Sequence, residues 1–196
     1  MTSRDQTPAR LRRPRAGYTI LELLVVVAIV GITLGMVAPR FRMSGATAVQ
    51  LAGTQMAQDI DVTRTRALST RQLSRVAFRE GAKAYGGYLD HNDDGVIGEV
   101  AIEWQELRGF GERPLPAGIG YGRGPAPAIP DDASGGTITF TNARVEFDSR
   151  GLVVPQGTGG VVYLRSETES DAVVAISVAP SGNTRLWTWK SVGGWK

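Results

Sequence analysis

The sequence predicts an α+β protein, in which a long N-terminal helix is followed by an antiparallel β-sheet or sandwich domain. Three observations predict this order. An apolar run fills residues 18–38, apolar residues then recur every three or four positions up to about residue 70, and beyond that the apolar period changes to two. A chain of 196 residues has room for one globular domain and an appendage.

The first element is the run from Tyr18 to Ala38. A helix of its 21 residues would be about 31 Å long, which matches the hydrocarbon core of a bilayer. Five arginines precede it and only Arg40 and Arg42 follow closely, which favours a single-pass transmembrane helix with a cytoplasmic N-terminus and an exported C-terminal domain. A removed signal peptide and a buried core helix are alternatives. The 16-residue uncharged stretch ending at Ala38, with no A-x-A sequence after it, argues against a signal peptide.

Glu22 is the only charged residue in this run. A carboxylate costs about 2.5 to 3.5 kcal/mol at mid-bilayer depth and less near the interface. The run has no basic residue that would pair with it. One explanation is a Glu22 that snorkels to the headgroups or is protonated there, but the sequence favours a partner from another chain.

The segment from Ala16 to Val26, A-G-Y-T-I-L-E-L-L-V-V, resembles the cleavage and methylation motif of type IV pilins and type II secretion pseudopilins. The resemblance implies that a prepilin peptidase removes the leader, residues 1–17, by cleaving after Gly17, and methylates the new N-terminus at Tyr18. Family members usually carry Phe where this chain has Tyr18. It also implies that Glu22 neutralises the N-terminal ammonium of a neighbouring subunit, and that residues 18–43 remain as a transmembrane and assembly helix.

Residues 44–72 are predicted to form an amphipathic continuation of that helix. Six small or apolar residues recur at steps of three and four and define its buried stripe: Val49, Ala52, Met56, Ile60, Thr63 and Ala67. The charged residues Asp59, Arg64, Arg66 and Arg71 lie off this stripe. They are predicted to form a solvated helix face.

Residues 73–196 are predicted to form the β-domain. Its seven candidate strands are residues 73–79, 100–107, 137–141, 143–148, 161–165, 172–178 and 184–190. Two tight turns are expected at Asp148-Ser149-Arg150-Gly151 and Pro180-Ser181-Gly182-Asn183. Residues 109–136 contain 8 Gly and 5 Pro, which predicts a long irregular loop.

The two turns, with the strands at residues 161–165 and 173–178, resemble the C-terminal region of the GspH/FimT pseudopilin family, whose charged hairpin resembles residues 90–95 with Glu99. The resemblance implies a GspH-type minor pseudopilin of the type II secretion system: a structural subunit for protein secretion across the outer membrane, anchored in the bacterial inner membrane with a periplasmic β-domain. Its partners would be other pseudopilins in a filament or tip complex. A FimT-like minor pilin, for pilus assembly or DNA uptake, is the alternative, whereas a monomeric anchored binding domain leaves Glu22 without a partner.

The C-terminal tail is the candidate for direct contact with DNA or a partner, through Arg185, Trp187, Trp189 and Lys190. The alternative is that the tryptophans of this strand cover the core. The FimT branch implies a G-R-x-R motif where this chain has Gly182-Asn183-Thr184-Arg185, so only Arg185 matches. Residues 1–17 carry a charge of +4, so residues 18–196 sum to −1, which disfavours nucleic-acid binding without excluding it.

Other chemistry has little support in the sequence. The absence of Cys excludes disulfides, Cys-based metal sites and a thiol nucleophile, and His91 is the only histidine. Asp90, Asn92 and Asp94 match the first half of a calcium loop, but its twelfth position is Ala101 instead of Glu, so a solvated turn is favoured over calcium binding. The sequence has no nucleophile elbow, so we expect neither an enzyme nor a cofactor.

Overall fold

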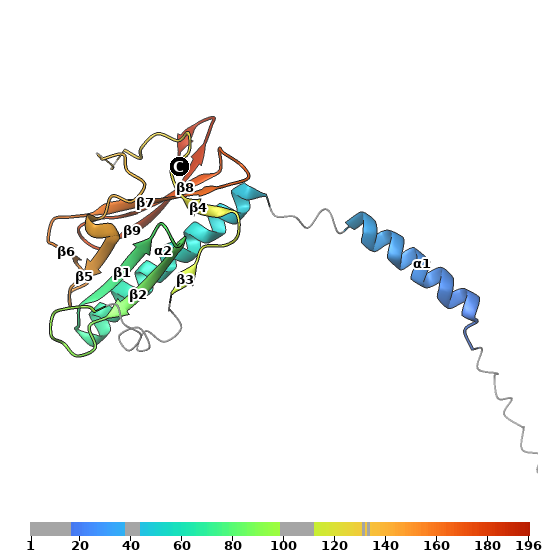
Figure 1. Ribbon diagram of the computed structural model, residues 1–196, viewed down its shortest axis with the longest axis horizontal. Coiled ribbons are helices and arrows are strands. Elements are labelled where there is room, and N and C mark those ends of the chain that lie inside the picture. The colour runs from blue at the N-terminus through green and yellow to red at the C-terminus, as the bar shows by residue number, and fades with distance from the viewer. Residues whose placement is uncertain (1–16, 38–43, 99–111, 131, 133) are drawn as a thin grey trace, which may run out of the picture. The chain divides into compact units, whose positions relative to one another are not determined.

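The computed structural model describes residues 17–37, 44–98, 112–130, 132 and 134–196 (Figure 1). The chain divides into two compact units, Met1–Arg42 and Met43–Lys196. The first unit contains helix α1 (Ile20–Val37), and the second contains helix α2 (Gly45–Thr70) and two β-sheets. The predicted continuity of the two helices through residues 38–43, the predicted strand at residues 100–107, and Glu99 and Ala101 lie outside the described residues.

Two antiparallel five-stranded sheets form the β-domain, as the sequence predicts. The N-terminal sheet has the strand order β3-β2-β1-β5-β6 and the C-terminal sheet has the order β10-β9-β8-β7-β4. Their bounds are β1 (Ser74–Arg79), β2 (Ala84–Leu89), β3 (Arg113–Pro114), β4 (Ile119–Tyr121), β5 (Arg144–Phe147), β6 (Val153–Val154), β7 (Gly160–Ser166), β8 (Val173–Val178), β9 (Thr184–Lys190) and β10 (Gly194–Trp195). A short 3₁₀ helix, η2 (Thr141–Ala143), precedes β5.

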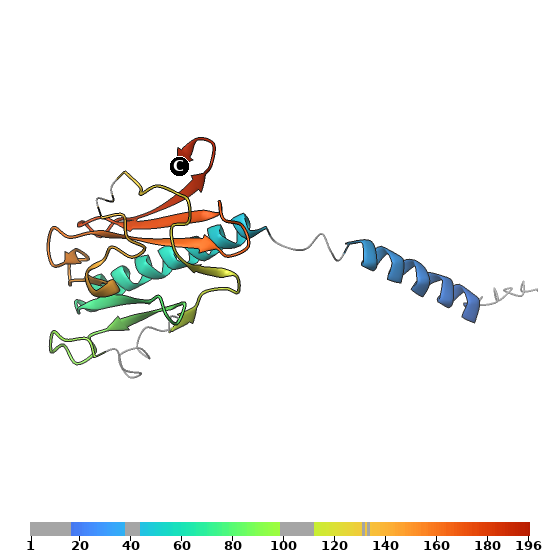
Figure 2. The same cartoon turned by 45° about the horizontal axis from the view of Figure 1, so that its top comes forward.

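Helix α2 contacts strands of both sheets (Figure 2), and its buried side chains belong to the main hydrophobic core. Every residue of the predicted stripe is buried, and Met56 and Ile60 are fully inaccessible. A Cβ atom on Gly53 would lie 2.7 Å from a methyl group of Val174, so glycine lets the helix approach β8 closely. The apolar stripe of α2 therefore holds the helix against the sheets.

The N-terminus of α2 is capped twice. The hydroxyl of Ser44 accepts a hydrogen bond from the backbone N–H of Thr47 at 3.2 Å. The carboxylate of Glu169 accepts from the N–H groups of Gly45 and Ala46 at 2.7 and 3.0 Å. Because the first N–H groups of a helix have no partner within the helix, these contacts tie α2 to the loop before β8.

Two charged residues predicted to lie on a solvated helix face are instead part of the packing. Asp59 is buried, and its carboxylate accepts hydrogen bonds from the Tyr85 hydroxyl at 2.6 Å and the Gln55 amide at 3.1 Å and pairs with Arg113 at 2.9 Å. Burial and the contact with Asp59 raise the pKa of Tyr85 far above its ordinary value. The prediction was wrong because the apolar stripe does not reveal a polar partner on another strand.

Arg64 is the second correction, because it joins the two predicted turns. Its guanidinium donates to the carbonyl oxygens of Gly151 at 3.0 Å and Ser181 at 3.1 Å. A Cβ atom on Gly182, whose φ is +81°, would overlap the Gly151 carbonyl oxygen and crowd Arg64. The Gly residues that the sequence marked as turn formers thus also allow the two turns to meet around one side chain.

The strand predictions were right for most of the C-terminal half and incomplete elsewhere. The predicted strands at residues 73–79, 143–148, 161–165, 172–178 and 184–190 are confirmed within one or two residues at each end. Residues 137–141 supply only a bridge at Ile138 and the first residue of η2. Strand β2 was missed because it is buried on both faces, with Gly86 and Gly87 at its centre, and shows no alternation. The predicted loop at residues 109–136 contains β3 and β4.

Candidate functional site

The N-terminal motif lies at the point where α1 begins. Helix α1 starts at Ile20, and Thr19 caps it by accepting the backbone N–H of Glu22 at its hydroxyl and that of Leu23 at its carbonyl, both at 3.2 Å. Glu22 stands three residues after Thr19, in the first turn, where the helix dipole favours a negative charge. Gly17 and Tyr18 precede the helix, have no regular structure and are exposed.

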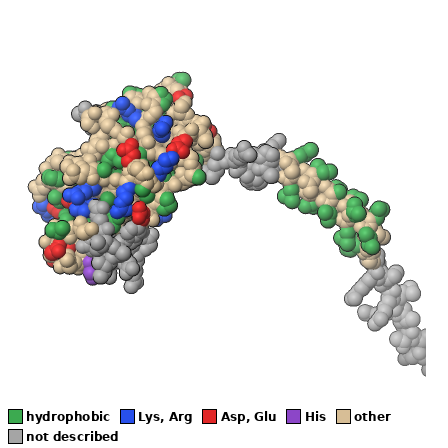
Figure 3. Space-filling model, in the orientation of Figure 1, with side chains coloured by type: hydrophobic (Ala, Val, Ile, Leu, Met, Phe, Trp, Pro, Cys, Tyr) green, Lys and Arg blue, Asp and Glu red, His purple; other side chains and the backbone are tan. Residues whose placement is uncertain are grey.

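Helix α1 has no polar face. Its large hydrophobic side chains are exposed, from 47% at Val30 to 85% at Ile20, and Figure 3 shows them along the visible side of the helix. The hydroxyl of Thr33 donates to the carbonyls of Ile29 and Val30, both at 2.9 Å, and is therefore satisfied within the helix. A helix that is apolar all round needs an apolar environment. In the part of the chain that the structure describes, no helix is both long and apolar enough to cross a membrane.

The predicted C-terminal contact residues lie on β9. Arg185, Trp187 and Trp189 share its outer face, whereas Lys190 lies on the opposite face because side chains alternate along a strand. Trp187 is buried, and its indole N–H donates to the Ser177 hydroxyl at 2.9 Å. The Arg185 guanidinium lies 3.7 Å from the centre of the Trp187 ring and is exposed to solvent. Trp189 is half-buried and packs on Trp195, with ring centres 5.4 Å apart. Trp187 thus covers the outer face of the sheet, while Arg185 and Lys190 remain accessible.

Residues 126–130, with Asp132, Ser134 and Gly135, lie along one side of this outer face. The Tyr163 hydroxyl donates to the Asp132 carboxylate at 2.7 Å and accepts the N–H of Ile129 at 3.0 Å. Burial opposes ionisation of Asp132, but hydrogen bonds from Tyr163, Gly135 and Ser134 outweigh it and lower the pKa of Asp132. Burial is also the main cause that raises the pKa of Tyr163 to about 12. The sequence carries no periodic signal for this network, because its members come from a predicted loop and a distant strand.

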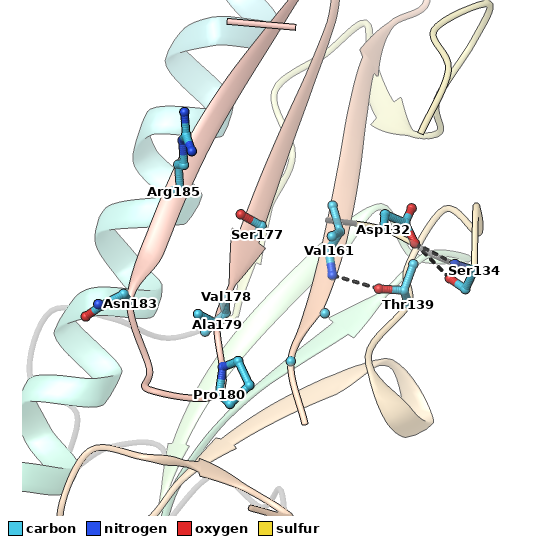
Figure 4. A pocket seen from close by; sticks show the side chains of 12 residues that line it. Asp132, Ser134, Thr139, Val161, Ser177, Val178, Ala179, Pro180, Asn183 and Arg185 are labelled. Atoms are coloured by element: carbon cyan, nitrogen blue, oxygen red, sulfur yellow. Dashed lines mark hydrogen bonds between the residues drawn. The ribbon is translucent and has the colours of Figure 1, made fainter. Parts of the chain in front are cut away.

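A pocket of 590 Å³ lies between this segment and β9 (Figure 4). Arg185 lines it at one side and Asp132 and Ser134 at the other, with Ser177 and Val161 between them. Asp132 already accepts four hydrogen bonds, so its carboxylate is committed to the protein. Arg185 is the charged group of the pocket that remains available to a partner.

The acidic loop that matches the first half of a calcium loop is at residues 90–95. Its side-chain oxygen atoms accept hydrogen bonds from N–H groups of the loop itself. The buried Asp90 carboxylate accepts the N–H groups of Asp94 at 3.2 Å and Gly95 at 2.7 Å. Asp94 accepts the N–H of Val96 at 2.8 Å and the amide of Asn92 at 2.8 Å. Among the described residues, no group of three or more His, Cys, Asp or Glu side chains is placed to hold a metal ion. These hydrogen bonds show that the Asp and Asn side chains stabilise the turn in which they lie.

The comparisons with known proteins address both units. Residues 12–38 match the model of the prokaryotic N-terminal methylation motif. The minor pseudopilin EpsH of the Vibrio cholerae type II secretion system superposes with a TM-score of 0.50 at 16% identity, over 73% of this chain and 95% of EpsH. The chain therefore carries a prepilin-type methylation motif and has a pilin-like fold.

The type IV minor pilin FimU of Pseudomonas aeruginosa is also similar to this pilin-like protein, with a TM-score of 0.45 and 15% identity over 70% of this chain and 87% of FimU. No curated protein sequence matches the chain. The likeness to EpsH is one of fold over the matched part of the chain, and with the helix and antiparallel sheets of this structure it confirms the predicted α+β class.

Proposed function

We propose that this pilin-like protein is a minor pseudopilin of the type II secretion pseudopilus, acting in protein export across the outer membrane as a structural subunit. The observation that carries the proposal is a methylation motif placed directly before a helix with no polar face, in a chain whose globular domain has the fold of EpsH. Such a helix requires an apolar environment, which a membrane or a bundle of similar helices would supply. The role needs no catalytic group.

The proposed maturation begins at the N-terminus. A prepilin peptidase cleaves after Gly17 and methylates Tyr18, which removes the arginine-rich leader at residues 1–17. Residues 18–43 anchor the precursor in the bacterial inner membrane, with the N-terminus in the cytoplasm. The β-domain, residues 73–196, then lies in the periplasm on the helix formed by residues 44–72. The exposed position of Gly17 and Tyr18, outside any regular structure, supports access by a peptidase.

Glu22 is proposed to direct assembly. Its carboxylate lies in the first turn of an otherwise apolar helix. Placed in lipid or in a bundle of such helices, it gains most from pairing with a positive group, and the methylated ammonium at Tyr18 of a neighbouring subunit supplies one. The pairing would draw the helix out of the bilayer sideways into a helical bundle.

A FimT-like minor pilin for pilus assembly or DNA uptake is the second candidate. The observation that favours it is the accessible Arg185 stacked on Trp187, since aromatic and cationic side chains together bind single strands. An electrophoretic shift assay on residues 43–196 separates the two roles. Tight DNA binding that weakens steeply with salt would favour the second role, and its absence supports the first.

The N-terminus of the protein recovered from membranes tests the shared pathway. Intact mass and N-terminal sequencing should find a chain that begins at methylated Tyr18, and Gly17→Ala should leave the uncleaved precursor. An intact Met1 or a start after Ala38 would contradict the pathway. Glu22→Ala should be processed normally and fail to co-assemble with other pseudopilins, whereas Thr33→Ala, in the same helix, should assemble.

A further inference from the structure

Strand β9 is paired along only part of one edge. On one side it pairs with β8 from Thr184 to Thr188. On the other side β10 reaches Trp189 and Lys190, and Thr188 exchanges two backbone hydrogen bonds with Lys196, at 2.9 and 3.1 Å. The first half of β9 therefore has a neighbour on one side only.

The pairing of Thr188 identifies which backbone groups are open. Residues of an antiparallel strand direct their N–H and C=O groups alternately to the two sides, so Thr184 and Leu186 point in the same direction as Thr188, away from β8. The N–H and C=O groups of Thr184 and Leu186 form no hydrogen bond with any described residue. They recur about 7 Å apart, the spacing at which an added strand forms its hydrogen bonds.

The side chain of Thr184 gives a second, independent indication. Its hydroxyl is buried and has no hydrogen-bond partner in the described part of the chain, which is costly for a polar group. Beside it runs a groove of 320 Å³ between α2 and the start of β9, lined by Asp61, Arg64, Thr65, Leu68, Asn183 and Thr184. A polar group from a bound segment would satisfy this hydroxyl.

The surroundings of the edge define the sequence that fits. Paired residues of neighbouring strands place their side chains on the same face, so an added strand would set every second side chain beside Arg185 and Trp187. Arg185 is exposed on this face. The intervening side chains would lie over α2, where Leu68 is 45% exposed. Acidic and apolar residues in alternation complement these two faces.

We propose that the open half of β9 binds an extended segment of a neighbouring subunit by strand addition, with acidic side chains toward Arg185 and apolar side chains toward α2. The added strand hydrogen-bonds to the backbone of Thr184 and Leu186. The inference deepens the proposed function and rests on it only for the source of the strand. The hairpin of β9 and β10 blunts the remainder of the edge, which confines pairing to this half.

The test is a titration of isotope-labelled residues 43–196, a unit that contains the buried core and so folds on its own. The probe is a capped peptide of four Val-Glu repeats, followed by nuclear magnetic resonance. We expect shifts centred on the amides of Thr184 and Leu186, and slower hydrogen exchange of both amides when the peptide is bound. A peptide of four Val-Lys repeats should bind about tenfold more weakly.

Two variants make the result specific. Thr184→Pro removes an outward N–H without removing a bond to β8, and should abolish binding of both peptides. Arg185→Glu should reverse the preference, so that the Val-Lys peptide binds more tightly. The spectrum away from β9 reports whether each variant is folded, and Arg150→Glu, at an exposed turn, is the matched control that should keep the original preference.

Three results would overturn the proposal. The first is strong exchange protection of the Thr184 and Leu186 amides in the free domain. The second is peptide binding that Thr184→Pro and Arg185→Glu leave unchanged. The third is a single-stranded oligonucleotide that binds the same residues more tightly than the peptide, which would identify the surface as a nucleic-acid site. Failure of Glu22→Ala to impair assembly would instead contradict the proposed function and leave this experiment unaffected.

Discussion

Helices α1 and α2 differ in where their apolar side chains go. The large apolar side chains of α1 are exposed around its whole circumference, whereas α2 buries one stripe against both sheets and exposes the opposite face. Helix α2 thus finds its apolar partner within the chain. Helix α1 has no such stripe and needs an apolar environment, which under the proposed function is lipid or the helices of other subunits. Under the proposed function, the two long helices therefore serve folding and assembly separately.

The carboxylates of the two helices make the same contrast. Asp59 in α2 is buried with a tyrosine, a glutamine and an arginine around it. The carboxylate of Glu22 in α1 has no partner among the described residues. A buried carboxylate is tolerated when it is paired, as Asp59 is, and the proposed function assigns Glu22 a partner in another subunit.

The largest expected difference between the helices appears when one apolar side chain is truncated in each. Ile60→Ala, at a fully buried position of α2, should lower the free energy of unfolding of the domain by about 2 to 5 kcal/mol. Ile29→Ala, at a position 56% exposed in α1, should leave it unchanged. Urea unfolding of the detergent-solubilised chain measures both. Equal losses would break the contrast between the helices.

A smaller effect is expected for the buried carboxylate. Asp59→Ala leaves the buried hydroxyl of Tyr85 without its acceptor and should cost about 1 to 3 kcal/mol of unfolding free energy. Asp61→Ala, an exposed carboxylate two residues further along α2, is the control and should have little effect. If both variants unfold at the same urea concentration, the Asp59 contacts contribute nothing to stability.

The helix caps offer a finer comparison. Glu169→Ala removes the acceptor of two N–H groups at the start of α2 and should destabilise the domain by about 1 kcal/mol. Thr19→Ala removes the hydroxyl cap of α1 and should leave domain unfolding unchanged. Thermal unfolding of the two variants in the same detergent resolves the difference, which a shift in the Thr19 variant would contradict.

The smallest effect concerns acid stability. Burial opposes ionisation of Asp148, but hydrogen bonds from Arg150 and Leu152 outweigh it and hold the pKa of Asp148 below its ordinary value of 3.8. A pKa that folding lowers adds stability above 3.8, and this stability disappears as the pH falls through the folded pKa. Asp148→Asn should therefore flatten the loss of unfolding free energy below about pH 5. Unfolding curves at several pH values test this, and an unchanged slope would contradict it.

Particular residues show how far sequence reasoning reached. The buried stripe of α2 was predicted correctly because apolar residues that recur with a period of 3.6 indicate a helix with one buried face. Strand β2 was missed because both of its faces are buried, so alternation gives no signal. The Trp187 side of β9 was open to two interpretations, since alternating aromatic and basic residues fit a covering strand as well as a binding face. The contacts of Trp187 with Ser177 and Arg185 resolve it into a buried ring and an accessible cation.

The sequence by itself determined the α+β class, the apolar character of α1, the position of Glu22 within it and the turns around Gly151 and Gly182, because periodicity and turn chemistry are local properties. Only the tertiary structure decided that Asp59 is buried, that Arg64 joins two turns and that β9 keeps half of one edge open. Those features depend on which distant segments meet, and partners brought together by folding leave no mark in the spacing of neighbouring residues.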